Sequence, residues 1–118
     1  MRVASFFAGC GGLDFGFKNA GFTLEVANEI ETNFANSYQK LTNHNAVVED
    51  FWNLTDQAFK SDIIIGGPPC QSFSLVGKRL IDDPRGKLVK GFLDLILENQ
   101  PKAFVMEKNS VAEKFQIQ

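Results

Sequence analysis

The sequence predicts an α/β fold in which a parallel sheet carries helices on both faces. Two observations lead to this prediction. Short apolar runs alternate regularly with stretches of helical character along the 118 residues. Glycines and carboxylates also follow the apolar runs repeatedly, in the segments FAGCGG, NE, ED, GGPPCQ and ME. Because parallel α/β sheets bind ligands beyond the carboxyl ends of their strands, this second pattern is typical of an enzyme.

The first half of the chain contains three predicted strands and two predicted helices. Residues 2–9 (RVASFFAG) are expected to form a buried strand that ends in glycines, and residues 11–21 (GGLDFGFKNAG) a helix closed by glycine. A second strand is predicted over residues 22–29 (FTLEVANE), followed by a helix over residues 31–41 (ETNFANSYQKL). A short third strand is expected at residues 45–50 (NAVVED).

The second half adds two strands and a longer helix. A weak helix is predicted at residues 54–60 (LTDQAFK), before a fourth strand at residues 62–67 (DIIIGG) that is β-branched and therefore expected to be buried on both faces. The helix over residues 87–99 (KLVKGFLDLILEN) ends before Pro101, and a fifth strand with an uncovered edge follows at residues 103–107 (AFVME). One apolar face of that helix is formed by Leu88, Phe92, Leu95 and Ile96.

Composition excludes several classes of function. The length allows a single domain, and no run approaches the roughly eighteen apolar residues of a membrane span, so a cytoplasmic protein is expected. Cys10 and Cys70 are the only cysteines and His44 is the only histidine, so neither a disulfide framework, a metal site nor a Ser-His-Asp triad is expected. We expect His44 in a solvated loop and Cys10 in a packing role. The formal net charge of −2 decides nothing about nucleic acid.

Glycines and acids at the ends of the first three strands favour an adenosyl ligand. Gly9, Gly11 and Gly12 can bring the backbone close to a ligand, although a tight strand-to-helix turn alone would look the same. Glu29 ends the second strand seventeen residues after Gly12, where an acid can accept hydrogen bonds from a ribose diol. Asp50 ends the third strand and can accept from an adenine amino group. Either acid alone would be taken for a surface residue.

Cys70 lies at the ligand end of the fourth strand. The two prolines at 68 and 69 fix the approach of the chain, and Gln71, Ser72 and Ser74 make the surroundings polar. A buried cysteine is usually a small inert hydrophobe. A thiol held rigidly outside the strand is better suited to a nucleophile, because its surroundings then set how much thiolate is available.

Two charged features lie beyond the fourth and fifth strands. Glu107 follows an apolar strand, so we expect its carboxylate to be poorly solvated and to act as a proton donor, although an exposed strand-end acid is an equal alternative. Residues 77–90 carry a net charge of +3, which suits phosphate contacts but also a solvated loop. The basic residues of this loop are Lys78, Arg79, Arg85, Lys87 and Lys90.

Four segments together resemble the DNA (cytosine-5) methyltransferases in order and spacing: FAGCGGLDFGF, GGPPCQSFS, DDPRGKL and FVME. The resemblance extends from Phe7 to Glu107. It implies a Rossmann-like S-adenosylmethionine-dependent methyltransferase fold, with residues 1–118 forming a single partial catalytic domain. On this interpretation the chain holds the cofactor half and the catalytic cysteine loop, and the carboxyl-terminal strands and a target-recognition domain are missing.

The resemblance also implies residue roles. It implies S-adenosylmethionine contacts from Phe7, Gly9, Gly11, Gly12, Glu29, Ile30, Asp50, Phe51, Pro69 and Leu88. It implies a catalytic group of Cys70, Glu107, Pro69 and Gln71. It implies contacts to double-stranded DNA from a loop containing Ser72, Ser74, Lys78, Arg79 and Arg85. By analogy, the Cys70 thiolate adds to carbon 6 of a flipped cytosine while Glu107 holds or protonates ring nitrogen 3, so that carbon 5 accepts a methyl group.

The chain departs from the family after the fifth strand. The family has Glu-Asn-Val, whereas this chain has Glu107-Lys108-Asn109-Ser110-Val111, and the family continues into an arginine motif, a target-recognition region and a closing segment. Three alternatives follow. The chain is the amino-terminal subunit of a split enzyme that needs a second polypeptide, a truncated and inactive remnant, or a non-catalytic cofactor-binding or regulatory module.

Overall fold

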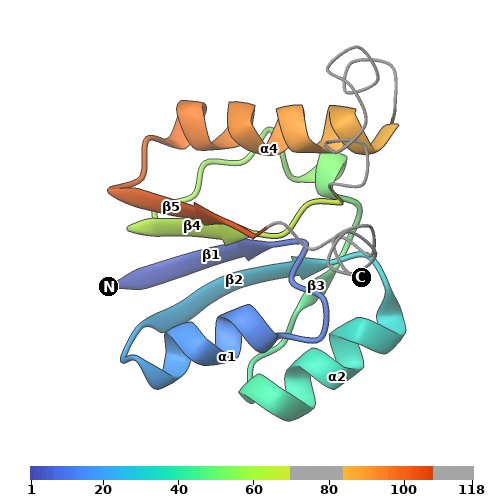
Figure 1. Ribbon diagram of the computed structural model, residues 1–118, viewed down its shortest axis with the longest axis vertical. Coiled ribbons are helices and arrows are strands. Elements are labelled where there is room, and N and C mark those ends of the chain that lie inside the picture. Colours follow the sequence, from blue (N-terminus) through green and yellow to red (C-terminus); the bar gives the residue numbers. More distant parts are fainter. Residues whose placement is uncertain (70–83, 108–118) are drawn as a thin grey trace, which may run out of the picture.

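The structure is a computed structural model that describes residues 1–69 and 84–107, the side chains of residues 84 and 85 excepted. The described residues form a five-stranded sheet in the order β3-β2-β1-β4-β5, and every neighbouring pair of strands is parallel (Figure 1). The strands are β1 (Arg2–Phe6), β2 (Thr23–Glu29), β3 (Val47–Val48), β4 (Ile63–Gly66) and β5 (Ala103–Met106). The predicted fold class is confirmed, and each strand is shorter than predicted: β2 begins one residue later, and the other four strands end before their predicted last residue.

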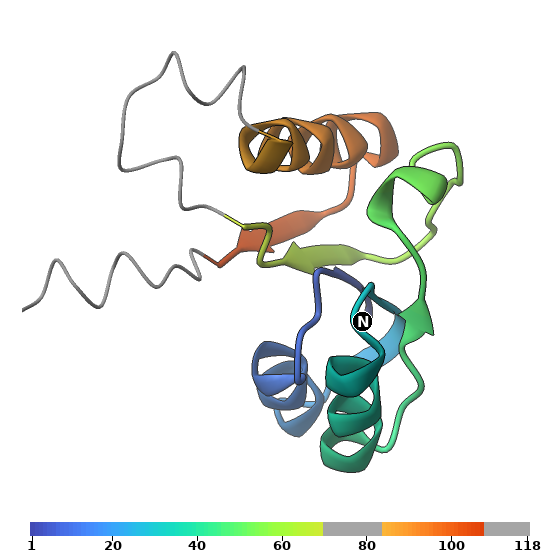
Figure 2. The ribbon, with the colours of Figure 1, turned by 90° about the vertical axis from the view of Figure 1, so that its right-hand side faces the viewer.

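Helices cover both faces of the sheet, as predicted. Helices α1 (Gly12–Asn19) and α2 (Thr32–Thr42) lie on one face, and α4 (Pro84–Asn99) lies on the other (Figures 1 and 2). None of the helices within residues 1–69 and 84–107 is long and apolar enough to cross a membrane. The sheet therefore occupies the middle of a three-layer arrangement, and the carboxyl ends of its strands all lie at one edge.

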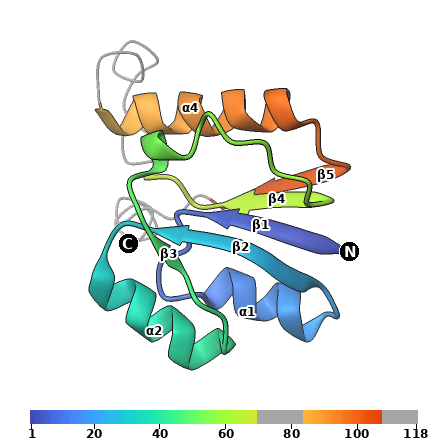
Figure 3. The same ribbon diagram turned by 180° about the vertical axis from the view of Figure 1, so that it is seen from behind.

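The weak helix predicted at residues 54–60 is wrong. A 3-10 helix, η1 (Phe51–Asn53), forms just before it, because the Asp50 side chain accepts a hydrogen bond from the Trp52 N–H at 3.0 Å and so caps its start. Figure 3 shows this part of the chain passing from β3 to the side of the sheet that α4 covers. Leu54 then buries its side chain in the core, and the chain continues to β4 without a regular helix.

The central strands supply both halves of the hydrophobic core. On the α4 side, Phe6 and Ile64 pack with Phe92, and on the opposite side Ile63 and Ile65 belong to a cluster around Tyr38. Alternate residues of a strand point to opposite faces, so β4 is buried on both, as its continuous apolar run predicted. Fully burying each large apolar side chain contributes about 1.5–3 kcal/mol.

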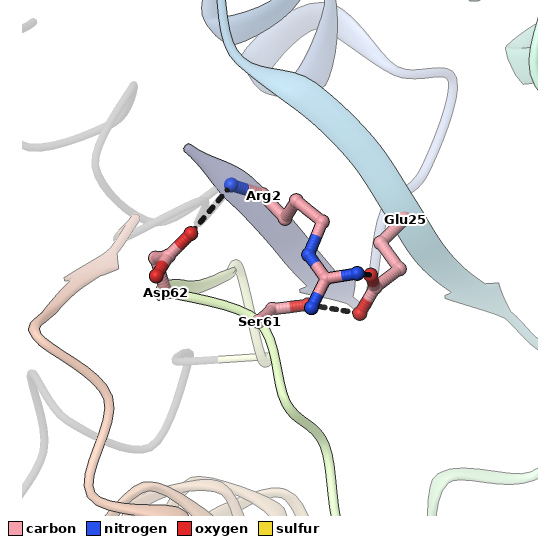
Figure 4. Close-up of polar contacts among 4 residues, drawn as sticks. All are labelled: Arg2, Glu25, Ser61 and Asp62. Carbon is pink, nitrogen blue, oxygen red and sulfur yellow. Dashed lines mark hydrogen bonds and ion pairs between the residues drawn. The ribbon is translucent and has the colours of Figure 1, made fainter.

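Polar contacts join the amino ends of four strands, at the edge of the sheet remote from the strand carboxyl ends. Figure 4 shows the contacts among Arg2, Glu25, Ser61 and Asp62. Arg2 Nη1 lies 2.7 Å from Glu25 Oε2, and Ser61 Oγ donates to Glu25 Oε1 at 2.8 Å. The Arg2 N–H donates to Asp62 Oδ2 at 2.9 Å, and Lys102 Nζ lies 3.4 Å from Asp62 Oδ1. Hydrogen bonds from the Arg2 backbone and Lys102 lower the pKa of Asp62. The contacts are mostly exposed, so each ion pair adds little stability by itself.

Strand β5 lies at one edge of the described sheet. Phe104 and Val105 on this strand are 50% and 40% exposed, although both are large and apolar. The uncovered edge that the sequence predicted is therefore present within the described residues.

Candidate functional site

A cavity of about 230 Å³ opens beside the carboxyl ends of β1 and β2. Ten residues line it: Phe7, Asn28, Glu29, Ile30, Glu49, Asp50, Phe51, Trp52, Pro69 and Leu88. Seven of these were predicted to contact a cofactor, and the other three predicted residues are the glycines of the turn after β1. The structure thus brings together side chains from five segments of the chain that are far apart in sequence.

The turn after β1 has an unusual backbone. Phe7, Gly9 and Gly11 all have positive φ values, of 54°, 60° and 95°. This conformation is uncommon for an aromatic residue, and packing holds Phe7 there, because its ring lies 4.8 Å from that of Phe51. A residue held in this way is typical of a ligand-binding turn. Cys10, expected in packing, is instead exposed, because it lies at the tip of the turn between two glycines.

The glycines of this turn have different environments. A Cβ atom on Gly11 would lie 2.8 Å from Tyr38 Cδ2 and 3.1 Å from Thr42 Cγ2, so this glycine is required for packing against α2. A Cβ atom on Gly9 or Gly12 would meet nothing within 4 Å, so space is left above their backbone. Contacts from these glycines to a cofactor stay predictions.

Glu29 is almost buried at the end of β2, and two backbone groups fix its carboxylate. The Gly9 N–H donates to Oε1 at 2.8 Å, and the Glu31 N–H donates to Oε2 at 2.7 Å. Each oxygen keeps a further acceptor position, because a carboxylate can accept about four hydrogen bonds. Glu29 therefore connects the glycine turn to β2 and still presents acceptors to the cavity.

A second acidic group follows β3. Asp50 Oδ1 caps η1, while its exposed position leaves the other carboxylate oxygen accessible at the cavity. Glu49 Oε1 accepts from Asn53 Nδ2 at 2.6 Å and from the Asp50 N–H at 3.1 Å. Sequence reasoning found Asp50 but not Glu49, whose position next to Asp50 was the only signal.

Asn28 is a structural residue that sequence reasoning missed. Its buried Nδ2 donates to the carbonyl oxygens of Val47 at 3.2 Å and Glu49 at 2.8 Å. These bonds attach the short strand β3 to β2 and so set the position of the acids that follow β3. The signal available was a polar amide inside an apolar strand, directly before Glu29.

Apolar walls complete the cavity. Phe51 is buried between the Phe7 ring and the core, whereas Ile30 is largely exposed at the mouth. Leu88 on α4 is half-buried and Pro69 follows β4. Flat apolar surfaces with a few fixed acceptors are typical of sites for small organic ligands.

The predicted catalytic residues are only partly described. Cys70, Gln71, Ser72, Ser74, Lys78 and Arg79 lie outside the described residues, and so does the side chain of Arg85 in α4. Glu107 follows β5, and its N–H donates to the Gly66 carbonyl at 2.8 Å. Its Oε2 lies 3.5 Å from the point where a Cβ atom on Gly67 would stand, which is beside the segment that leads to Cys70. Glu107 is exposed, so the poor solvation expected for it is wrong, and the equal alternative of an exposed strand-end acid is the one observed.

A buried polar network beneath the glycine turn was also missed. Ser5 Oγ donates to Asp14 Oδ1 at 2.9 Å, and the Tyr38 hydroxyl donates to Asp14 Oδ2 at 2.6 Å. Burial raises the pKa of Asp14 and, together with the charge of Asp14, that of Tyr38. His44 lies in a loop, as predicted, but it is half-buried with its ring 6.4 Å from that of Tyr38 and its Nδ1 buried, so the expected solvation is wrong.

Comparison with known proteins confirms the resemblance. The family of C-5 cytosine-specific DNA methylases matches residues 1–111, and the chain belongs to that family. It is 44% identical over 117 residues to the Type II methyltransferase M.AquIA of Picosynechococcus sp., covering 90% of this chain and 47% of that protein. It is 46% identical over 111 residues to the Type II methyltransferase M.FnuDI of Fusobacterium nucleatum, covering 91% and 32%.

A solved structure supports the same family. It is that of a protein described as a DNA modification methyltransferase encoded within a prophage (E. coli), with a TM-score of 0.70 and 32% identity, covering 98% of this chain and 34% of that chain. The chain therefore spans about half the length of the first curated relative and about a third of the other two proteins.

Proposed function

We propose that this chain is the cofactor half of a DNA cytosine-5 methyltransferase. It binds S-adenosylmethionine in the cavity beside β1 and β2, supplies Cys70 as nucleophile, and acts on double-stranded DNA together with a second polypeptide. The observation that carries the proposal is the meeting of Glu29 and Asp50 with the rings of Phe7 and Phe51 in one cavity.

The residues present fit this cofactor. Glu29 offers acceptor positions for the two hydroxyl groups of a ribose, and the accessible oxygen of Asp50 can accept from an amino group. Phe7, Phe51 and Ile30 offer apolar surface to a planar base. When bound, S-adenosylmethionine supplies the electrophilic methyl group that carbon 5 of cytosine accepts.

The chain's own residues supply the remaining chemistry. The Cys70 thiolate forms a bond to carbon 6 of a cytosine that has left the duplex, at a cost of a few kcal/mol for unstacking. Glu107 holds ring nitrogen 3, so that the electron pair displaced by the thiolate makes carbon 5 nucleophilic. Loss of the proton from the methylated carbon 5 then breaks the bond between sulfur and carbon 6 and restores the thiolate. The proximity of Glu107 to Gly67, three residues before Cys70, supports this pairing of roles.

In this proposal the second polypeptide supplies target recognition and covers the uncovered edge of the sheet at β5. The exposed Phe104 and Val105 on β5 support it, since large apolar side chains at a sheet edge favour pairing with another chain.

Calorimetric titration with S-adenosylmethionine tests the cofactor site. We expect saturable binding by the wild-type chain and at least about tenfold weaker binding by Glu29→Gln, which corresponds to about 1.4 kcal/mol. Glu98→Gln, an exposed glutamate on α4, is the matched control and should bind like the wild type. Absence of binding by folded wild-type chain, or equal binding by Glu29→Gln, would contradict the proposed site.

A second experiment tests the role of Cys70. Transfer of a labelled methyl group to duplex DNA is measured in the presence of a chain that carries the carboxyl-terminal half of a relative. Cys70→Ser should abolish transfer while leaving calorimetric binding of the cofactor unchanged, and Cys10→Ser should retain both. Methyl transfer by Cys70→Ser would refute the covalent step. If the wild-type chain binds the cofactor but transfers no methyl group with any complementing chain, the result would favour an inactive remnant or a non-catalytic cofactor-binding module.

A further inference from the structure

Trp52 is the only tryptophan of the chain, and it lines the candidate cofactor cavity. It is the second residue of η1, directly after Phe51. Trp52 is 47% exposed, whereas Phe51 beside it in the same cavity is buried. An exposed indole at the mouth of an apolar cavity offers a large flat surface for a ligand.

The position of Trp52 is closely determined. Its N–H donates to Asp50 Oδ1 at 3.0 Å, and its carbonyl accepts from Thr55 Oγ1 at 3.1 Å. Its ring makes an edge contact with Phe51 at a centroid distance of 5.4 Å. Both backbone groups and one edge of the ring are thus held before any ligand binds.

Gly91 in the middle of α4 makes room for the indole. A Cβ atom on Gly91 would lie 2.5 Å from Trp52 Cη2 and 2.7 Å from Cζ3. Its backbone has no positive φ, so the helix does not need glycine for its conformation, and glycine there costs about 0.5–1 kcal/mol relative to alanine. The close approach of the indole to α4 is the feature of this site that requires a glycine.

We propose that Trp52 is a specificity-determining wall of this cavity that contacts the purine base of the ligand, and that Gly91 seats its indole for that contact. The inference rests on the proposed function, because the ligand it names is the adenosyl part of S-adenosylmethionine. We assign Trp52 to the purine end of the ligand for two reasons. Trp52 adjoins Asp50, whose accessible oxygen suits the amino group of a base, and Phe51 and Ile30 border the same cavity.

Intrinsic fluorescence tests the contact directly, since a single tryptophan reports on this site. The wild-type chain is titrated with S-adenosylmethionine, with adenosine and with methionine, under excitation that tyrosine does not absorb. We expect a saturable change of emission with the first two ligands and none with methionine. Calorimetry on the same samples establishes whether each ligand binds.

Five variants test the roles of Trp52 and Gly91. Trp52→Leu should weaken binding of S-adenosylmethionine about tenfold, as expected when a stacked base loses an aromatic partner, and Trp52→Phe should weaken it less. Phe34→Leu, at a side chain that is also 47% exposed but lies on α2, should bind like the wild type. Gly91→Ala should displace the indole, moving the emission of the free protein to longer wavelengths and weakening binding, whereas Gly16→Ala, with open space at its Cβ position, should do neither.

The outcomes separate this inference from the proposed function. Calorimetric binding with unchanged fluorescence, or with equal affinity in Trp52→Leu, would refute the role of Trp52 and leave the cofactor site intact. A response to methionine but not to adenosine would place Trp52 at the other end of the ligand and would likewise refute the inference. Absence of calorimetric binding by the folded wild-type chain would overturn the proposed function, and this inference with it.

Discussion

Removal of the Tyr38 hydroxyl should destabilise the protein in a pH-dependent way. The hydroxyl donates to Asp14 Oδ2 at 2.6 Å, and both side chains are buried, Asp14 being 1% exposed. Tyr38→Phe leaves that oxygen without its donor and keeps the ring against Gly11. A hydrogen bond to a charged group contributes about 1.5–3 kcal/mol, so we expect a loss of about 2 kcal/mol in the free energy of unfolding at neutral pH.

The pH dependence follows from the pKa of Asp14. Burial raises this pKa above 3.8, and the Tyr38 hydrogen bond opposes the rise, so Tyr38→Phe should raise it further. A raised pKa in the folded state contributes stability that is present below 3.8 and is lost as the pH rises through the folded value. The deficit of Tyr38→Phe should therefore be smallest in acid, at about 1 kcal/mol for a neutral hydrogen bond, and should grow toward neutral pH.

Urea unfolding of the wild type and of Tyr38→Phe at a series of pH values measures this deficit. Asp14→Asn is the control background, because an amide can still accept from Ser5 and contact Tyr38 but does not ionise. In that background Tyr38→Phe should cost about 1 kcal/mol at every pH. A deficit in the wild-type background that stays constant with pH, or one below about 0.5 kcal/mol at neutral pH, would refute the reasoning.

Three further predictions concern stability. Gly11→Ala should lower the free energy of unfolding by about 2–4 kcal/mol in urea unfolding, because it adds a Cβ atom at a φ of 95° and 2.8 Å from Tyr38, whereas Gly16→Ala should not lower it. Asn28→Ala should cost about 2 kcal/mol in the same assay, because it removes two hydrogen bonds that attach β3 to β2, and wild-type stability would contradict the role given to this amide. The lowered pKa of Asp62 contributes stability that is present above pH 3.8 and is lost as the pH falls through the pKa of the folded state. The thermal midpoints of Asp62→Asn and of the wild type should therefore converge in acid. A difference that persists in acid would argue against a stabilising role for the contacts of Asp62 with Arg2 and Lys102.

The sheet was predictable because its evidence is local. A continuous apolar run such as that around Ile64 identifies a strand buried on both faces, and alternation with helices implies parallel pairing. The order β3-β2-β1-β4-β5 was not predicted, because it depends on which strands pair across loops. The error at residues 54–60 has a similar origin. The Asp50 side chain caps a 3-10 helix and Leu54 joins the core, and neither event shows in the helical pattern of the segment.

The candidate site was likewise predictable only in part. Glu29 and Asp50 were found because each ends a predicted strand. The sequence left the exposure of Glu107 undecided, because it depends on what packs around the end of β5. The sequence did not predict the contact between Trp52 and Gly91, because these residues lie in distant segments of the chain.

What the sequence determined by itself is the class of fold, the family and the residue types of the site. Local periodicity sets the strands and helices, and the chemistry of a cofactor demands particular side chains after particular strands. The tertiary structure alone decided that Gly11 serves packing, that Asp14 pairs with Tyr38, and that Gly91 receives Trp52. These contacts join residues 24 to 39 positions apart, so they depend on how helices pack on the sheet, which no local pattern specifies.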